Sequence, residues 1–296
     1  MSFILISTIF FFIFFWSYIK IWGYLRNDIP TGSGIVFAFH ILFIGFYLDI
    51  SLIYISSTLL LIFFYYLDDL YGLNYLLRIF LQLCSAILIL TIYNFQNNIY
   101  FLVSIIILFV CLINVINFQD GNDLNLASII LLVFSVIYLS SQNDYIIDLS
   151  LIGILSILIF SIFNKKKFNI YLGDSGCYAF TILIFIITLF EHENLMLLKS
   201  VISILIFPIV DVFFVIAYRI YKKENLLTRN YYHIYQILFK KSKYYLYLIP
   251  NILISIINFI IFLNLEFNII WIINIILFNI IILSILRYIL FKRKII

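Results

Sequence analysis

Two adjacent aspartates, Asp68 and Asp69, follow a long apolar run that begins near Leu52. Only 11% of the chain is charged, so paired acids at this place are a strong chemical signal. Charged groups near a bilayer are costly and mark sites for ions, substrates or protons. Such a pair can supply a metal ligand and a general base, because like charge raises one of the two pKa values. The simpler interpretation is two acids exposed to water at the membrane surface.

Three further polar clusters stand at the ends of apolar runs, at residues 114–123, 164–175 and 211–236. In the first, Asn114-x-x-Asn117-x-x-Asp120-Gly121 places polar groups at positions i, i+3 and i+6. On a helix the first two lie on one face. This spacing can hold a nucleotide or a metal, whereas a capped helix end would explain one such residue but not three.

The second cluster contains Gly173-Asp174-Ser175-Gly176 after a run of three lysines at 165–167. It puts a carboxylate at a predicted helix start, with flanking glycines that let a phosphate approach. Mg²⁺ prefers oxygen ligands and shares its remaining positions with water and substrate phosphates. For the lysines, membrane topology is a simpler explanation than direct ligand binding.

The third cluster begins at Asp211, one turn after Pro208. Pro208 is expected to kink its helix, and the kink would aim Asp211 inward. A structural Asp near the interface explains Asp211 equally well. In the following loop, residues 219–244, the segment 231–236 with His233 can bind a sugar phosphate, and Arg229 can grip the phosphate as a fork. An amphipathic segment lying on anionic lipid is the alternative.

The elements that must position these groups are membrane helices. The chain is 66% apolar with a mean hydropathy of +1.19, whereas soluble domains are nearer half apolar. We predict an all-α integral membrane protein in which residues 1–296 form one polytopic domain. Eleven transmembrane helices are predicted, at 3–22, 35–48, 52–67, 77–93, 99–116, 124–141, 146–163, 174–190, 196–218, 245–263 and 269–290.

The basic residues set the predicted orientation. With the amino terminus outside and the carboxyl terminus cytoplasmic, 17 of the 18 Lys and Arg residues fall on the inner side, and Lys199 is the exception. The net charge of +4 therefore concerns topology and not nucleic acid. The four polar clusters then share the inner level, and we predict that they converge in one site.

Taken in order, these clusters resemble the polyprenyl-phosphate N-acetylhexosamine-1-phosphate transferases, within glycosyltransferase family 4. The resemblance runs from about Asp28 to Gln236 and begins with Pro30-Thr31-Gly32-Ser33-Gly34, a degraded form of the family's first loop. It continues through the four motifs that contain Leu67-Asp68-Asp69, Asn114 to Gly121, Asn164 with Tyr171 to Gly176, and Pro208 to Asp211.

The resemblance implies roles for individual residues. Mg²⁺, with Mn²⁺ as an alternative, would be held by Asp174 and Asn117. Asp68, Asp69 and His233 would be catalytic, although which Asp acts as base stays open. Substrate binding would fall to Asn114, Asp120, Asp123, Asn164, Asp211 and Arg229.

The resemblance also implies an activity. Such an enzyme moves N-acetylhexosamine-1-phosphate from a UDP-sugar to undecaprenyl phosphate at the cytoplasmic face of the bacterial inner membrane, and UMP leaves. The donor sugar would be GlcNAc or a deoxy or modified relative, and a homodimer is left open. Only His233 remains of the histidine-rich final loop of the peptidoglycan branch, which favours the branch that starts O-antigen or capsule.

Two other functions compete with this interpretation. A multi-span transporter or flippase would use the carboxylates for ion coupling, with acids near the midplane and an internal repeat. A non-catalytic scaffold would carry vestigial motifs, which the intact Asp68, Asp69, Asn117 and Asp174 oppose.

Overall fold

The computed structural model describes residues 2–25, 32–37, 52–92, 99–120, 124–164, 170–225, 232–240 and 245–292. These residues form helices and turns with no strand, which confirms the all-α prediction. The helices are α1 (Ser2–Leu25), α3 (Leu52–Tyr71), α4 (Tyr75–Ile92), α5 (Ile99–Gln119), α6 (Asn125–Ser140), α7 (Asp144–Phe163), α8 (Gly173–Phe190), α9 (Leu195–Tyr221), α10 (Ile234–Lys240), α11 (Tyr245–Leu263) and α12 (Ile269–Lys292).

Seven of the described helices are long and apolar enough to cross a membrane, namely α1, α5, α7, α8, α9, α11 and α12. The chain is therefore a multi-pass membrane protein. The structure supports fewer spans than the eleven predicted, because α4 and α6 are apolar but shorter and α3 is not among the seven. Most of the predicted span 35–48 lies outside the described residues. The full count and the orientation of the termini stay predictions.

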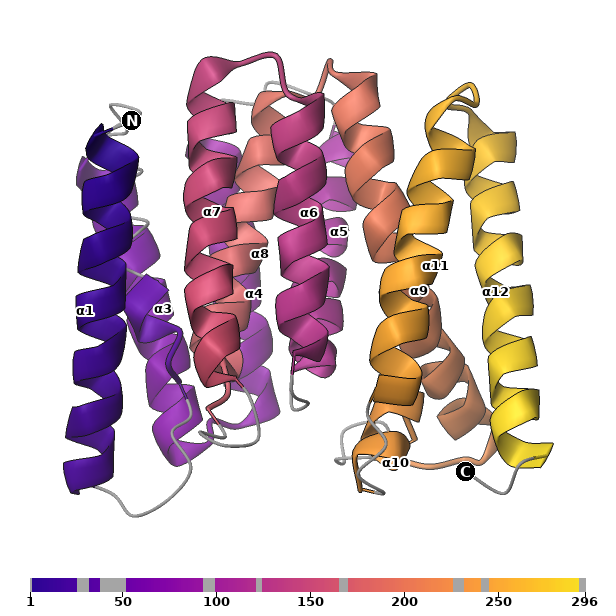
Figure 1. Cartoon of the computed structure of the whole chain (residues 1–296), viewed down its shortest axis with the longest axis horizontal. Helices are drawn as coiled ribbons and strands as arrows, with labels where there is room; N and C mark the ends of the chain where they lie inside the picture. The colour runs from indigo at the N-terminus through magenta and orange to yellow at the C-terminus, as the bar shows by residue number, and fades with distance from the viewer. Residues whose placement is uncertain are drawn as a thin grey trace.

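The bundle places α8 and α9 inside and α1 and α12 at its two edges (Figure 1). α8 packs against α3, α5 and α6, and α9 packs against α6, α11 and α12. In the middle of α8, the Phe180 ring lies 4.4 Å from that of Phe37 and 5.9 Å from that of Phe134, measured between centroids. Because α8 is surrounded in this way, its first turn is held in place by several neighbours.

Buried polar side chains join several of the helices. Asn258 of α11 and Asn279 of α12 exchange hydrogen bonds at 2.9 and 3.2 Å. Ser140 of α6 and Ser200 of α9 lie 2.9 Å apart. Such interhelical bonds stabilise membrane bundles because every polar group in hydrocarbon needs a partner.

The predicted polar clusters lie at helix ends that share one end of the bundle. The α6–α7 and α11–α12 turns lie at the upper end in Figure 1, whereas α10 and the last turn of α12 lie at the lower end. α3 ends at Tyr71, four residues later than the predicted span 52–67. Asp68 and Asp69 therefore stand in its last turn. α5 likewise runs to Gln119 and includes Asn117.

Candidate active site

Asp69 caps the start of α8. Its carboxylate accepts hydrogen bonds from the Asp174 backbone N–H at 2.7 Å, the Ser175 backbone N–H at 3.1 Å and the Ser175 hydroxyl at 2.7 Å. The predicted approach of a phosphate to these amides is thus not what this structure shows, because a carboxylate from α3 already takes them. A negative group at a helix N-terminus also balances the helix dipole. Asp69 therefore fixes where Asp174 stands.

Asp69 stands in the last turn of α3, near the polar end of the bundle. Burial raises the pKa of its carboxyl to about 6, while the hydrogen bonds from Ser175 and Asp174 act in the opposite direction. The three hydrogen bonds that Asp69 accepts suit an ionised carboxylate.

Asp120 and Asn164 hold the turns on either side of this cap. The Asp120 carboxylate accepts a bond from the Gly173 backbone N–H at 2.8 Å. Asn164, at the end of α7, accepts from the Leu124 N–H at 2.7 Å and donates to the Ile170 carbonyl at 2.6 Å. Asn164 is buried and shapes the backbone of two loops. Its contact with substrate stays a prediction.

Asp68 is engaged by an arginine from the next helix. Arg78 of α4 donates from Nη2 to Asp68 Oδ1 at 2.8 Å, and its Nε lies 2.8 Å from Oδ2. Arg78 Nη1 also lies 3.7 Å from Asp174 Oδ2. The Asp68 side chain has no exposed surface, whereas that of Arg78 is 41% exposed and that of Asp174 is 19% exposed. One guanidinium therefore links a buried carboxylate to an accessible one.

Removal of the Arg78 guanidinium is expected to destabilise the protein through Asp68. In R78A the buried Asp68 carboxylate loses its fork partner, at a cost of about 1–3 kcal/mol in the free energy of unfolding. R78K keeps a charge but not the fork, so an intermediate stability is expected. Thermal unfolding in detergent measures this. The D68N/R78A protein should unfold at a higher temperature than R78A, and equal or lower stability would contradict the assignment.

A glycine loop packs against the start of α8. Ser33 donates its hydroxyl hydrogen to the Tyr171 carbonyl at 2.9 Å, and the Gly34 N–H donates to the Leu172 carbonyl at 3.0 Å. A Cβ added to Gly34 would lie 1.9 Å from the Gly176 backbone nitrogen. The first loop of the family resemblance therefore contacts the Gly-Asp-Ser-Gly turn through Ser33 and Gly34. Residues 28–31 of that loop lie outside the described part.

We expect G34A to displace this loop and lower activity by up to about a hundredfold, the scale of a 1 Å misplacement. The melting temperature should fall as well, because the clash is with backbone. G72N is the matched control: a side chain at Gly72 meets nothing within 4 Å, and Asn tolerates its φ of +70°. Equal loss in both variants would show that the close contact at Gly34 is unimportant.

The cluster carries excess negative charge. Among the described residues, Asp68, Asp69, Asp120 and Asp174 meet a single guanidinium, that of Arg78. The described residues contain no group of three or more His, Cys, Asp or Glu arranged to hold a metal. Mg²⁺ needs few protein ligands when a diphosphate and water supply the rest. The partly exposed Asp174 carboxylate and the net charge therefore fit a shared magnesium site.

Asp211 and His233 form a second cluster at the same end of the bundle. His233 Nδ1–H donates to Asp211 Oδ2 at 3.0 Å, and Arg287 Nη2 of α12 donates to Asp211 Oδ1 at 3.2 Å. His233 is only 2% exposed. α9 continues through Pro208, and Asp211 is fully buried, as the predicted inward direction requires.

The remaining predicted residues divide between structural contacts and the undescribed part. Asn114 pairs with Gln82 of α4 through bonds of 3.0 and 3.4 Å and also donates to the Val110 carbonyl. Asn117 is half-buried one turn before Asp120. Asp123 and Arg229 lie outside the described residues.

Two residues of these clusters were not predicted as site residues. Arg78 and Arg287 entered the sequence argument only as charges that set topology. For Arg78 a signal existed, because it lies ten residues after Asp68 and one turn into the next helix. Arg287 lies 76 residues after Asp211, and no spacing rule connects them.

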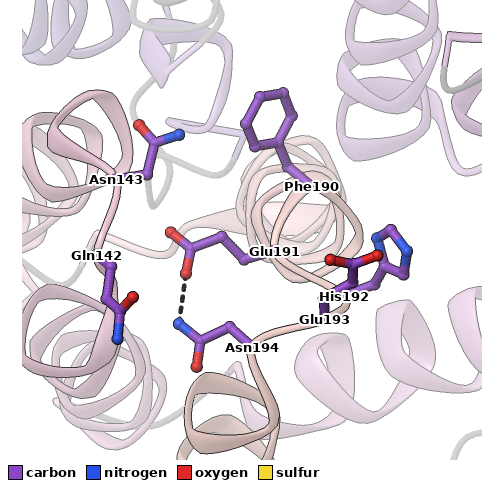
Figure 2. Close-up of a pocket in the computed structure, with 7 residues that line it drawn as sticks. All are labelled: Gln142, Asn143, Phe190, Glu191, His192, Glu193 and Asn194. Atoms are coloured by element: carbon purple, nitrogen blue, oxygen red, sulfur yellow. Dashed lines mark hydrogen bonds between the residues drawn. The ribbon is translucent and has the colours of Figure 1, made fainter.

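A pocket at the other end of the bundle is separate from these clusters. It is formed by Gln142, Asn143 and residues 190–194, and Figure 2 shows the side chains of Glu191 and Asn194 pointing toward each other in its lining. The Asn194 amide donates to Glu191 at 2.6 Å. Because α8 starts at the carboxylate cluster and ends at this pocket, the two lie at opposite ends of that helix.

Residues 51–192 match the model of the family described as Glycosyl transferase family 4. The match covers slightly less than half of the 296 residues. No curated protein matches the chain. The matched segment includes Asp68, Asp69, Arg78, Asp120, Asn164 and Asp174, whereas Asp211, His233 and Arg287 lie beyond it. The segment that builds the carboxylate cluster is therefore similar to glycosyltransferase family 4.

Proposed function

We propose that this protein transfers N-acetylhexosamine-1-phosphate from a UDP-sugar to undecaprenyl phosphate and so starts a lipid-linked O-antigen or another cell-envelope glycan. One observation carries the proposal: carboxylates from the ends of α3 and α5 and the start of α8 meet at one end of a membrane bundle. A lipid phosphate is fixed at the membrane surface and a nucleotide sugar is soluble. Their phosphates can therefore meet only at such an end.

The reaction follows from the two phosphates. An oxygen of the lipid phosphate attacks the sugar-proximal phosphorus, the bond from that phosphorus to the bridging oxygen breaks, and UMP leaves. The second pKa of a phosphate is near 6, so the acceptor oxygen is largely ionised at neutral pH. A strong general base is then hardly needed, and we assign the aspartates to positioning and charge.

Each residue has a defined task in this proposal. Asp69 and Asp120 hold the first turn of α8 through its backbone amides, which aims Asp174 at the open end. Arg78 neutralises Asp68, and its partly exposed side chain can also face the substrate phosphates. Mg²⁺ would be held by Asp174, with Asn117 as a second ligand, and would offset charge on the diphosphate.

The location belongs to the same proposal. We place the protein in the bacterial inner membrane with the carboxylate cluster facing the cytoplasm, where the nucleotide sugar is found. The basic residues at 20, 78, 219, 222 and 223 support this orientation, because positive charge accumulates on cytoplasmic loops.

The experiment is a donor assay. Purified protein is incubated with undecaprenyl phosphate and labelled UDP-GlcNAc, UDP-GalNAc or their 6-deoxy relatives, with Mg²⁺, with Mn²⁺ or with EDTA. We expect lipid-linked product with at least one donor and none with EDTA. Absence of lipid-linked product from every donor would overturn the proposal for this class of substrates.

A transporter is the alternative, with the carboxylates coupling ions to transport. It predicts acids near the midplane, whereas Asp68, Asp69 and Asp120 stand at helix ends and Asp174 stands in a first turn. Ion-driven uptake by proteoliposomes, without lipid-linked product, would favour this alternative.

A further inference from the structure

The Asp211 carboxylate is bound from two sides by side chains that are remote from it in sequence. Arg287 of α12 donates to Oδ1 at 3.2 Å, and His233, just before α10, donates to Oδ2 at 3.0 Å. Asp211 is fully buried and the Arg287 side chain is 21% exposed. An ionised carboxylate without water requires such partners, because its desolvation is otherwise very costly.

Arg287 is itself fixed in position. Its guanidinium carbon lies 4.4 Å from the ring centre of Phe214, one turn after Asp211 on α9. A planar guanidinium that stacks on an aromatic ring and bonds a carboxylate has little freedom left. α12 therefore supplies a rigid positive partner for α9.

His233 connects Asp211 to the end of α5, next to the carboxylate cluster. Its ring lies 5.7 Å from the Phe118 ring and 5.4 Å from the Tyr235 ring, measured between centroids. Phe118 stands between Asn117 and Asp120 at the end of α5. A carboxylate that accepts a histidine N–H fixes the orientation of that ring. The contacts thus run from α12 through Asp211 and His233 to the end of α5.

We propose that Arg287, which lies outside the segment matched by the family, is a positioning residue for the transfer reaction. It holds the Asp211 carboxylate, and through it His233, against the part of α5 that leads into Asp120. This inference rests on the proposed function. It assigns Arg287 to the nucleotide-sugar side of the site, because α10 and the end of α5 lie among the polar loops, whereas the lipid acceptor approaches through the membrane.

Kinetics with both substrates test the proposal. R287M should raise the KM for the nucleotide sugar about tenfold or more, the lower end of what loss of a supporting partner causes. The KM for undecaprenyl phosphate should stay near that of the unchanged protein, and R287K should recover part of the loss. K292M is the matched control, since Lys292 is an exposed cation on the same helix. Equal rises in both KM values, or no change in either, would overturn the proposal.

A measurement without activity separates this inference from the proposed function. In R287M the amides of α10, Ile234–Lys240, should exchange with deuterium faster than in the unchanged protein, whereas K292M should leave them unaltered. Unaltered exchange in R287M would overturn the positioning role. If no donor yields product but exchange in α10 rises, the proposed transfer fails while the link from Arg287 to His233 stands.

Discussion

Replacing Asp174 by alanine is expected to reduce the transfer rate at least about a hundredfold, the scale seen when a charge-stabilising group is removed. The melting temperature should change little. The side chain of Asp174 is partly exposed, and the bond that holds this turn to Asp69 uses the Asp174 backbone N–H, which alanine retains. The fold of the first turn of α8 should therefore survive. Initial rates and thermal unfolding on the same preparation measure both effects.

The matched control is D144A. Asp144 also stands in the first turn of an apolar helix, α7, but at the opposite end of the bundle. It should leave rate and stability near those of the unchanged protein. Near-full activity in D174A would remove this carboxylate from the mechanism. A large loss in D144A would instead point to a general effect of acids on these helices.

Replacing Asp69 by alanine is expected to lower both activity and stability. The rate should again fall at least about a hundredfold, because the turn that carries Asp174 loses its anchor. The free energy of unfolding should fall by about 0.5–2 kcal/mol, the cost of losing a helix cap. This joint loss distinguishes Asp69 from Asp174, whose removal should affect the rate alone.

The asparagine variant tests what Asp69 does. D69N removes the charge but keeps one accepting oxygen, which can serve either the Asp174 amide or Ser175, since these bond different carboxylate oxygens of Asp69. If Asp69 acts as an anchor, D69N should be clearly more active and more stable than D69A. If D69N is as inactive as D69A while its stability matches the unchanged protein, Asp69 acts through its charge on substrate or metal, and the anchoring role is wrong.

The membrane bundle could largely be predicted from the sequence, because apolar runs of about 20 residues leave few alternatives. Ten of the eleven predicted spans correspond to described helices, including the short α4 and α6. Helix ends were less predictable. α3 ends at Tyr71, four residues after the predicted end. Polar residues at the membrane surface, such as Asp68, can either form the last turn of a helix or belong to the loop that follows, and the sequence does not distinguish the two. The short α10, in a polar loop with little periodicity, was not predicted at all.

The meeting of Asp68, Asp69, Asp120 and Asp174 could be predicted from their common level and from the order of their motifs. Their individual contacts could not. Two adjacent aspartates point in different directions from one helix, so Asp68 bonds Arg78 while Asp69 bonds the start of α8. Which carboxylate meets which partner depends on the rotation of α3, and an apolar helix surrounded by lipid and protein gives little periodic signal of that rotation.

The partners of Asp211 could not be predicted from the sequence either. His233 and Arg287 come from separate segments. They meet at Asp211 because α12 packs beside α9 and α10 packs against α11, which itself packs against α9. Contacts between helices of a membrane bundle depend on small details of packing and leave no fixed spacing in the sequence. The Asp211 cluster therefore emerges only from the arrangement in space.

The most direct test of the central proposal follows the phosphorus atoms. A UDP-N-acetylhexosamine labelled with ³²P at the sugar-proximal phosphate is incubated with undecaprenyl phosphate and either the unchanged protein or D174A. We predict that the label enters the lipid product with the unchanged protein, that unlabelled UMP is released, and that D174A forms little labelled lipid. Release of labelled UDP, or an unlabelled lipid-linked sugar, would contradict transfer of a sugar phosphate by this site.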